Sequence, residues 1–119
     1  MTVLDASAVL AFLQGEPGAD VVRERLSGSV IGSANLAEVL ARMDGPVERS
    51  LAEAILVGSG VRTEAVSTDD ARGSAAIRDA TPGLSLGDRL CLALADRRND
   101  VVLTADRAWG KSDRILQIR

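Results

Sequence analysis

Short apolar runs recur along this chain and are separated by longer amphipathic segments. The apolar runs are Thr2 to Leu4, Ser29 to Gly32, Val61 to Val66, Val101 to Thr104 and Ile115 to Ile118. Runs of this length, rich in Val and Ile and bounded by turn residues, are typical of buried β-strands. The pattern predicts a short strand at each of these five places.

The amphipathic segments between them predict helices. The expected ranges are Ala6 to Gln14, Ala19 to Leu26, a segment carrying Leu36, Val39, Leu40 and Met43, then Val47 to Val57, Asp69 to Ala80 and Leu86 to Arg98. Ser33 or Asn35 can cap the third helix, and Gly45-Pro46 ends it. Leu86 to Arg98 has the clearest pattern, with Leu90, Leu94 and several alanines on one face.

Strands that alternate with helices indicate a parallel sheet, because a parallel crossover needs a connection of helical length. We therefore expect an α/β fold, a three-layer α/β/α sandwich with a four- or five-stranded parallel sheet. The length of 119 residues fits a single domain spanning residues 1–119. No internal repeat or long linker interrupts the pattern.

The composition excludes several kinds of chemistry. The chain has no histidine, which removes Ser-His-Asp and Cys-His catalysis and zinc sites of the HExxH type. It has one cysteine, one Trp, one Phe and no Tyr, so disulfides and aromatic platforms for unpaired bases are not expected. Acid-base chemistry must therefore use carboxylates, water and metal.

The expected location is the cytoplasm, without a membrane anchor. Asp5 interrupts the N-terminal apolar segment and no basic residue precedes it, unlike a secretory signal. The apolar runs are also much shorter than the ~20 residues that span a bilayer. Cys91, on an apolar helix, and Trp109 are expected to pack in the interior.

Two carboxylates stand where strands end. Asp5 follows the first strand and Asp106 the strand Val101 to Thr104, and functional groups gather at the carboxyl ends of parallel strands. The residues alone leave another interpretation open, in which each Asp is only a helix N-cap.

Two further acids lie on predicted helices. Glu38 is flanked by Leu36, Ala37, Val39 and Leu40 on a helix expected to face the core, where a carboxylate is costly unless it is paired or bound to a cation. Asp88 lies in the first turn of its helix, where the helix dipole alone could account for it. Asp69 and Asp70, by contrast, are expected only to begin a helix and not to belong to the site.

Taken together, these four acids suggest a metal site. Like charges brought close together raise one another's pKa values, and a divalent cation relieves that repulsion. Oxygen ligands without His or Cys favour Mg²⁺, with Mn²⁺ as a substitute. Such ions activate water for hydrolysis of phosphodiesters.

The motifs that carry these acids resemble the PIN-domain ribonucleases, and within them the VapC-type toxins of toxin-antitoxin modules. VLDASAVLAFL is similar to the opening motif, SANLAEVLARM to the helix with the second acid, GDRLCLALA to that with the third, and LTADRAW to the strand and turn with the fourth. The resemblance runs from end to end of the chain.

This resemblance implies roles for particular residues. Asp5, Glu38, Asp88 and Asp106 would be the catalytic metal ligands. Ser7 and Thr104 match hydroxyl residues that support them, although local hydrogen bonds to backbone remain an alternative. All but one of the 14 basic residues are arginines, and Arg89 and Arg107 are candidate phosphate contacts, although solvated helix faces explain such arginines equally well.

The resemblance also implies partners: an RNA substrate, a second copy of the toxin in a homodimer, and a small cognate antitoxin. A guanidinium pairs bidentately with carboxylates, so we expect an antitoxin segment that crosses the helices around Val22 and Leu40 and directs an Arg toward Asp5, Glu38 and Asp88.

Three alternatives remain at this stage. A response-regulator receiver has this size, a parallel sheet and an acidic Mg²⁺ site, but it needs an Asp at the end of its central strand, where this chain has Ser67 and Thr68 after the third apolar run. A catalytically silent PIN module that binds RNA or protein is the second, and a DNA-cleaving relative is the third.

Overall fold

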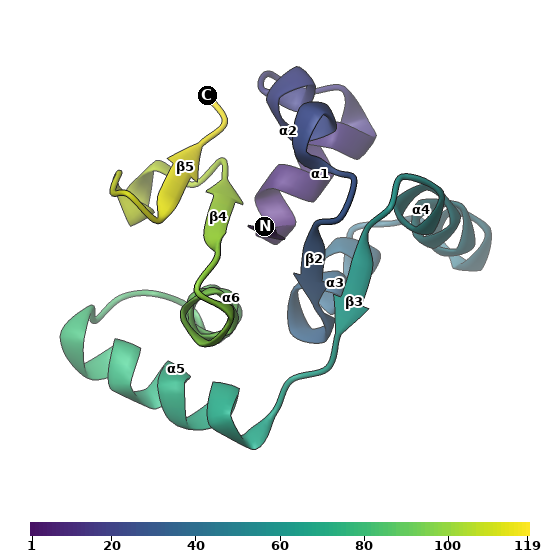
Figure 1. Ribbon diagram of the computed structural model, residues 1–119. Helices are drawn as coiled ribbons and strands as arrows, with labels where there is room; N and C mark the ends of the chain where they lie inside the picture. The colour runs from purple at the N-terminus through teal and green to yellow at the C-terminus, as the bar shows by residue number, and fades with distance from the viewer.

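The computed structural model describes residues 1–119 and contains a five-stranded parallel sheet with helices on both faces (Figure 1). The strands are β1 (Thr2–Leu4), β2 (Val30–Gly32), β3 (Arg62–Glu64), β4 (Val101–Thr104) and β5 (Ile115–Gln117). Their order across the sheet is β3-β2-β1-β4-β5, and every neighbouring pair is parallel. The predicted α/β/α architecture with a parallel sheet is confirmed.

Six α-helices and one 3₁₀ turn connect these strands. They are α1 (Ala6–Gln14), α2 (Ala19–Arg25), α3 (Ser33–Ala41), α4 (Pro46–Gly58), α5 (Thr68–Ala80), α6 (Leu86–Arg98) and η1 (Arg107–Trp109). The six helices predicted from periodicity are all present. None of them combines the length and apolar character needed to cross a membrane.

The central strand β1 separates two apolar clusters because successive side chains of a strand point to opposite faces. Leu4 joins a larger cluster that contains residues from α1 to α4, including Val9 and Val39. Val3 joins a smaller one with Cys91 and neighbouring residues of α6. The expectation that Cys91 and Trp109 are interior residues is confirmed, since they are 0% and 8% exposed.

Helix α5 lies outside α6 rather than on the sheet (Figure 1). Ion pairs connect this outer helix to the rest of the fold: Arg97 Nε of α6 donates to Asp70 Oδ1 at 2.7 Å, and Arg97 also pairs with Glu64 of β3. Arg98 bridges Glu64 and Asp100 at 2.9 Å each. These pairs fix α5 and α6 against the strands that end near them.

Two local predictions were wrong. Neither Ser33 nor Asn35 caps α3, because β2 enters the helix directly with Gly32 as the N-cap residue, and no side chain makes a capping hydrogen bond there. The third strand is shorter than the run Val61 to Val66, since only Arg62–Glu64 pairs with β2. That strand is at the edge of the sheet, and both Arg62 and Thr63 are exposed.

Candidate active site

The four acids that the sequence singled out lie around one pocket. Asp5 follows β1, Glu38 lies on α3, Asp88 on α6, and Asp106 follows β4, and all four line a hollow of about 320 Å³ together with Ala6, Ser7, Leu10 and Arg42. The pocket is at the carboxyl end of the sheet because β1 and β4 are adjacent parallel strands that end at the same edge. The topology thus brings together residues from both ends of the chain.

Asp5 is the most buried of the four, with 4% of its surface exposed. Its Oδ2 accepts hydrogen bonds from Ser7 Oγ at 2.6 Å and from Thr104 Oγ1 at 2.9 Å. Although Asp5 occupies the N-cap position of α1, its side chain makes no capping hydrogen bond. The N-cap interpretation of Asp5 is therefore wrong.

Ser7 and Thr104 also hold the segment that leads to the fourth acid. Ser7 Oγ accepts from the backbone N–H of Ala105 at 2.9 Å, and Thr104 Oγ1 accepts from that of Asp106 at 3.0 Å. Each hydroxyl thus donates to Asp5 and accepts from the turn after β4. The two hydroxyls fix the relative positions of Asp5 and Asp106.

The pKa of Asp5 is raised from 3.8 to about 6. Burial is the main cause, because it penalises the ionised carboxylate, and hydrogen bonds from Ser7 and Thr104 offset part of this effect. The carboxylates of Asp88 and Glu38 raise the pKa further. Asp88 and Glu38 are thus close enough for their charges to act on Asp5.

Glu38 is exposed at the pocket, although the helix that carries it also has a side facing the core. The helix instead buries Asn35, which is 1% exposed, and Val39. Asn35 Nδ2 donates to Glu38 Oε1 at 2.8 Å and to the carbonyl oxygen of Gly87 at 3.0 Å. Asn35 therefore positions Glu38 against the first turn of α6.

Asp88 and Asp106 do cap helices. Asp88 forms a capping box with Ser85, in which its Oδ2 accepts from the Ser85 N–H at 3.2 Å, and Asp106 Oδ1 accepts from the Ala108 N–H at 2.9 Å. Asp106 therefore does serve as the N-cap of η1 while it also lines the pocket, and the capping box accounts for part of the placement of Asp88. Neither role uses both oxygens of the carboxylate.

Each of the four carboxylates has one oxygen bonded to the protein and one that is not. The oxygens without a protein partner are Asp5 Oδ1, Glu38 Oε2, Asp88 Oδ1 and Asp106 Oδ2. None of these acids forms a salt bridge, even though Arg42 lines the same pocket. The pocket therefore presents four carboxylate oxygens that are not paired with any cationic side chain of the protein.

This donor set fits a hard divalent cation. All the available ligands are carboxylate oxygens, which Mg²⁺ and Mn²⁺ prefer, and the one nearby thiol, Cys91, is buried with a raised pKa. The acids surround an open pocket, and no three of them are grouped tightly enough to hold an ion as they stand. The match to the metal therefore rests on the type of ligand, carboxylate oxygen, and not on a preformed coordination geometry.

The two candidate phosphate contacts are in different places. Arg107 follows Asp106 and lines a neighbouring hollow. Arg89 lies toward α5, where its Nη1 donates to the Ser74 carbonyl oxygen at 3.4 Å, and it does not line the acidic pocket. The sequence analysis overlooked Arg42, which does line it, and the positioning role of Asn35; the Asn35-to-Glu38 spacing of three on a helix was the available signal.

The sequence is similar to known proteins along most of its length. The PIN domain model matches residues 2–115. The VapC ribonuclease Mb2780c of Mycobacterium bovis and ribonuclease VapC42 of Mycobacterium tuberculosis are each 35% identical to this chain over 114 residues, covering 85% of it and 87% of the relative.

Solved structures show the same fold at lower identity. A toxin-antitoxin complex from Klebsiella pneumoniae matches with a TM-score of 0.86 at 17% identity, covering 100% of this chain and 98% of that chain. VapC20 of Mycobacterium tuberculosis, described as a toxin that cleaves the sarcin-ricin loop, matches with a TM-score of 0.70 at 19% identity, covering 95% of this chain and 98% of that one. The receiver alternative is excluded, and the chain belongs to the PIN-domain family, in which its curated relatives are VapC ribonucleases.

Proposed function

We propose that this chain is a divalent-metal-dependent endoribonuclease and the toxin of a toxin-antitoxin pair. One observation carries the proposal: four carboxylates line one pocket, each with an oxygen held by the protein and an oxygen free to bind a ligand. Buried or clustered carboxylates without a cationic partner are costly, so such an arrangement indicates a function rather than stability.

Asp5, Glu38, Asp88 and Asp106 would hold Mg²⁺ or Mn²⁺ through their free oxygens. When bound, the ion would supply Lewis acidity and a lowered pKa for its water, the chemistry that hydrolyses phosphodiesters. Ser7 and Thr104 keep Asp5 in place by donating to its other oxygen, and Asn35 does the same for Glu38. Arg42 supplies a positive charge at the pocket that can attract the scissile phosphate.

The choice of RNA as the substrate rests on the relatives. The curated relatives from both mycobacteria are named as ribonucleases, and VapC20 is described as a toxin that cleaves the sarcin-ricin loop. The chain has no Tyr and only one Phe, so recognition through phosphates fits it better than recognition through base stacking.

An antitoxin partner is supported by structural relatives that are toxin-antitoxin complexes. The crossing around Val22 and Leu40 stays a prediction, although Val22 itself is 0% exposed inside the core and cannot supply the contact surface. A more suitable surface is the apolar groove lined by Leu13, Met43, Leu51, Ala52, Ile55 and the single acid Glu48.

This apolar groove is next to the acidic pocket. Leu10 lines the pocket, and Leu13, one turn further along α1, lines the groove. Likewise, Arg42 lines the pocket and the next residue, Met43, lines the groove. A peptide lying in the groove could therefore direct an Arg to the four carboxylates, in competition with the metal.

The proposal also includes a homodimer of the toxin. Light scattering of the purified protein tests this.

The deciding experiment combines cleavage and inhibition. The purified chain is incubated with total RNA in Mg²⁺, in Mn²⁺ and in excess EDTA, and the new 5′ ends are sequenced; single-stranded DNA is the parallel substrate. We expect site-selective RNA cleavage that EDTA abolishes and that a co-expressed small partner protein suppresses. Full activity in EDTA would overturn the metal site, cleavage of DNA alone would overturn the RNA substrate, and no cleavage at all would favour the silent-module alternative.

A further inference from the structure

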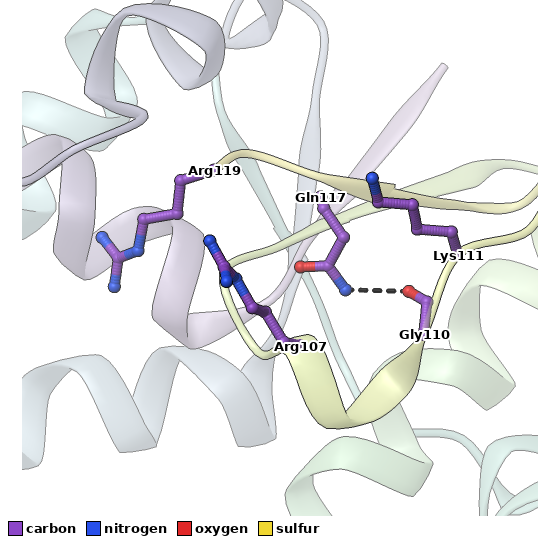
Figure 2. A pocket seen from close by; sticks show the side chains of 5 residues that line it. All are labelled: Arg107, Gly110, Lys111, Gln117 and Arg119. Carbon is purple, nitrogen blue, oxygen red and sulfur yellow. Dashed lines mark hydrogen bonds between the residues drawn. The ribbon is translucent and has the colours of Figure 1, made fainter.

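A second hollow, of about 350 Å³, lies beside the acidic pocket and has the opposite charge. Arg107, Gly110, Lys111, Gln117 and Arg119 line it, without an apolar or an acidic side chain among them. In Figure 2, Arg107 and Arg119 lie on one side of Gln117 and Lys111 on the other. We refer to these five residues as the basic hollow.

The three cations of the basic hollow have no carboxylate partner. Neither Arg107 nor Lys111 forms a side-chain hydrogen bond or salt bridge, and Arg119 only donates from Nη1 to the Pro17 carbonyl oxygen at 2.9 Å. Arg97 and Arg98, in contrast, are both paired with acids. In a chain with a net charge of −3, three unpaired cations around one concave surface repel one another, and an anion would relieve that repulsion.

The turn that carries Arg107 and leads to Lys111 is fixed at both ends. Gln117 Nε2 of β5 donates to the carbonyl oxygen of Asp106 at 2.9 Å and to that of Gly110 at 2.8 Å, so one side chain closes the η1 turn (Figure 2). Gly110 has φ 70° and ψ −161°, a backbone conformation that only glycine adopts readily. The basic hollow is thus built into the fold.

Asp106 and Arg107 connect the two hollows. Asp106 lines the acidic pocket and the next residue, Arg107, lines the basic hollow. A phosphodiester chain whose scissile phosphate lies at the acids can therefore continue past Asp106 into the basic hollow. Guanidinium and ammonium groups bind phosphate through charge-assisted hydrogen bonds, and the lack of apolar and aromatic side chains leaves no surface for a base.

We propose that the basic hollow binds the backbone phosphates of the RNA next to the cleavage site and so offsets the repulsion between the acidic pocket and a polyanion. The proposal rests on the ribonuclease function proposed above. It assigns Lys111 and Arg119 to substrate binding, without a role in reading the sequence. Arg107 shares this role, but because it adjoins Asp106, its substitution would also disturb the acidic pocket.

The test removes the two cations that are distant from the acids. Lys111→Gln/Arg119→Gln is compared with Arg62→Gln/Arg78→Gln, which removes the same charge from exposed, unpaired sites on β3 and α5. Each pair is placed in the Asp5→Asn background, and binding of an unstructured single-stranded RNA is measured by fluorescence anisotropy from low to high salt. Poly-glutamate is the second probe, because an acidic protein segment is the competing ligand.

We expect the Lys111/Arg119 variant to bind RNA on the order of 10-fold more weakly, with a log-log salt slope shallower by about 1.4, or roughly 0.7 per lost phosphate contact. The Arg62/Arg78 variant should keep the slope. In the active enzyme, the Lys111/Arg119 variant should raise KM and leave kcat nearly unchanged.

Two results would overturn the proposal: an unchanged RNA slope in the Lys111/Arg119 variant, or loss of poly-glutamate binding while RNA binding is retained. If the unsubstituted chain cleaves RNA but the slope does not change, only the basic hollow is wrongly assigned. If the unsubstituted chain cleaves no RNA, the proposed function itself fails, whatever the binding shows.

Discussion

Two groups of carboxylates in this protein differ in what neutralises them. Asp70, on α5, is 3% exposed and bonded to Arg97, and Glu64 and Asp100 are paired with Arg97 and Arg98. Asp5 is almost equally buried, at 4% exposed, but its carboxylate accepts hydrogen bonds only from hydroxyl groups. The charges of the first group are balanced by arginines of the same chain, whereas those of the second group are not.

The pKa values of the two aspartates move in opposite directions for this reason. Burial raises both, but at Asp70 hydrogen bonds from Arg97 and Ser67 outweigh burial and hold its pKa below the usual value. At Asp5 burial dominates, and the neighbouring Asp88 and Glu38 add to it, so its pKa rises to about 6. A buried carboxylate whose partner is present stabilises the fold, whereas one without a cation indicates that a ligand supplies the charge.

The largest expected difference is in catalysis, between Asp5→Asn and Asp70→Asn. Asn keeps an oxygen to accept from Ser7 and Thr104 but loses the free anionic oxygen, so Asp5→Asn should lower RNA cleavage by more than about 100-fold. Asp70→Asn should keep the cleavage rate per folded molecule, because Asp70 is outside the pocket. Initial rates with a fluorogenic RNA measure both, and equal losses in the two variants would contradict the comparison.

Asp70→Asn should instead affect stability. It leaves Arg97 without its closest carboxylate and removes an acceptor from the capping box with Ser67, which should lower the free energy of unfolding by about 2–3 kcal/mol. Arg97 is 33% exposed and keeps Glu64, so the loss should lie at the low end for a buried pair. Urea unfolding in EDTA measures it, with Asp69→Asn as the exposed neighbouring control.

The two aspartates should also respond to pH in different ranges. Because the folded-state pKa of Asp5 is raised, the folded metal-free protein binds more protons than the unfolded chain between pH 6 and 4, and its stability should rise by about 2 kcal/mol as the pH falls from 7 to 4. Asp70 has the opposite effect: because its folded-state pKa is lowered, its contribution to stability is lost as the pH falls from near its ordinary pKa of 3.8 through that lowered value. Urea unfolding across this range in EDTA should show the rise, and Asp5→Asn should remove it.

The sequence predicted the sheet and the position of the acids better than their surroundings. Alternating apolar runs and amphipathic segments reveal β-strands and helices because those patterns follow from local backbone geometry. Asp5 and Asp106 could be placed at one edge because parallel strands end together. The pairing of Asp70 with Arg97 joins positions 27 residues apart, and no local pattern encodes such a contact.

Glu38 shows the same limit on a single helix. Its apolar neighbours indicated only that the carboxylate lies on or beside the core-facing side of the helix, and the tertiary contacts turn Asn35 and Val39 inward and leave Glu38 at the pocket. That orientation depends on α6, whose Gly87 carbonyl accepts from Asn35. The packing of α3 against α6, rather than the local pattern, decides which way the carboxylate faces.

The smallest change that sharpens the comparison is a methyl group at Gly87. An added Cβ would lie 2.6 Å from Glu38 Oε1 and 2.8 Å from Glu38 Cδ, so the carboxylate must move. The atoms it meets are the end of a flexible side chain, and Gly87 is in the first turn of α6 without a positive φ, so Gly87→Ala should leave the fold intact and its stability equal or higher by about 0.5 kcal/mol. Displacing Glu38 from its hydrogen bond with Asn35 should nevertheless lower the rate of cleavage about 10-fold, comparable to losing a group that orients a metal ligand.

The effect of Gly87→Ala should appear as a need for more Mg²⁺ to reach half-maximal rate. Gly58→Ala is the matched control, because a Cβ there meets nothing within 4 Å, and it should change neither the rate nor the Mg²⁺ requirement. A Gly87→Ala protein with an unchanged Mg²⁺ requirement would mean that the position of Glu38 does not matter to the metal, and that only Asp5, Asp88 and Asp106 belong to the group that needs a cation.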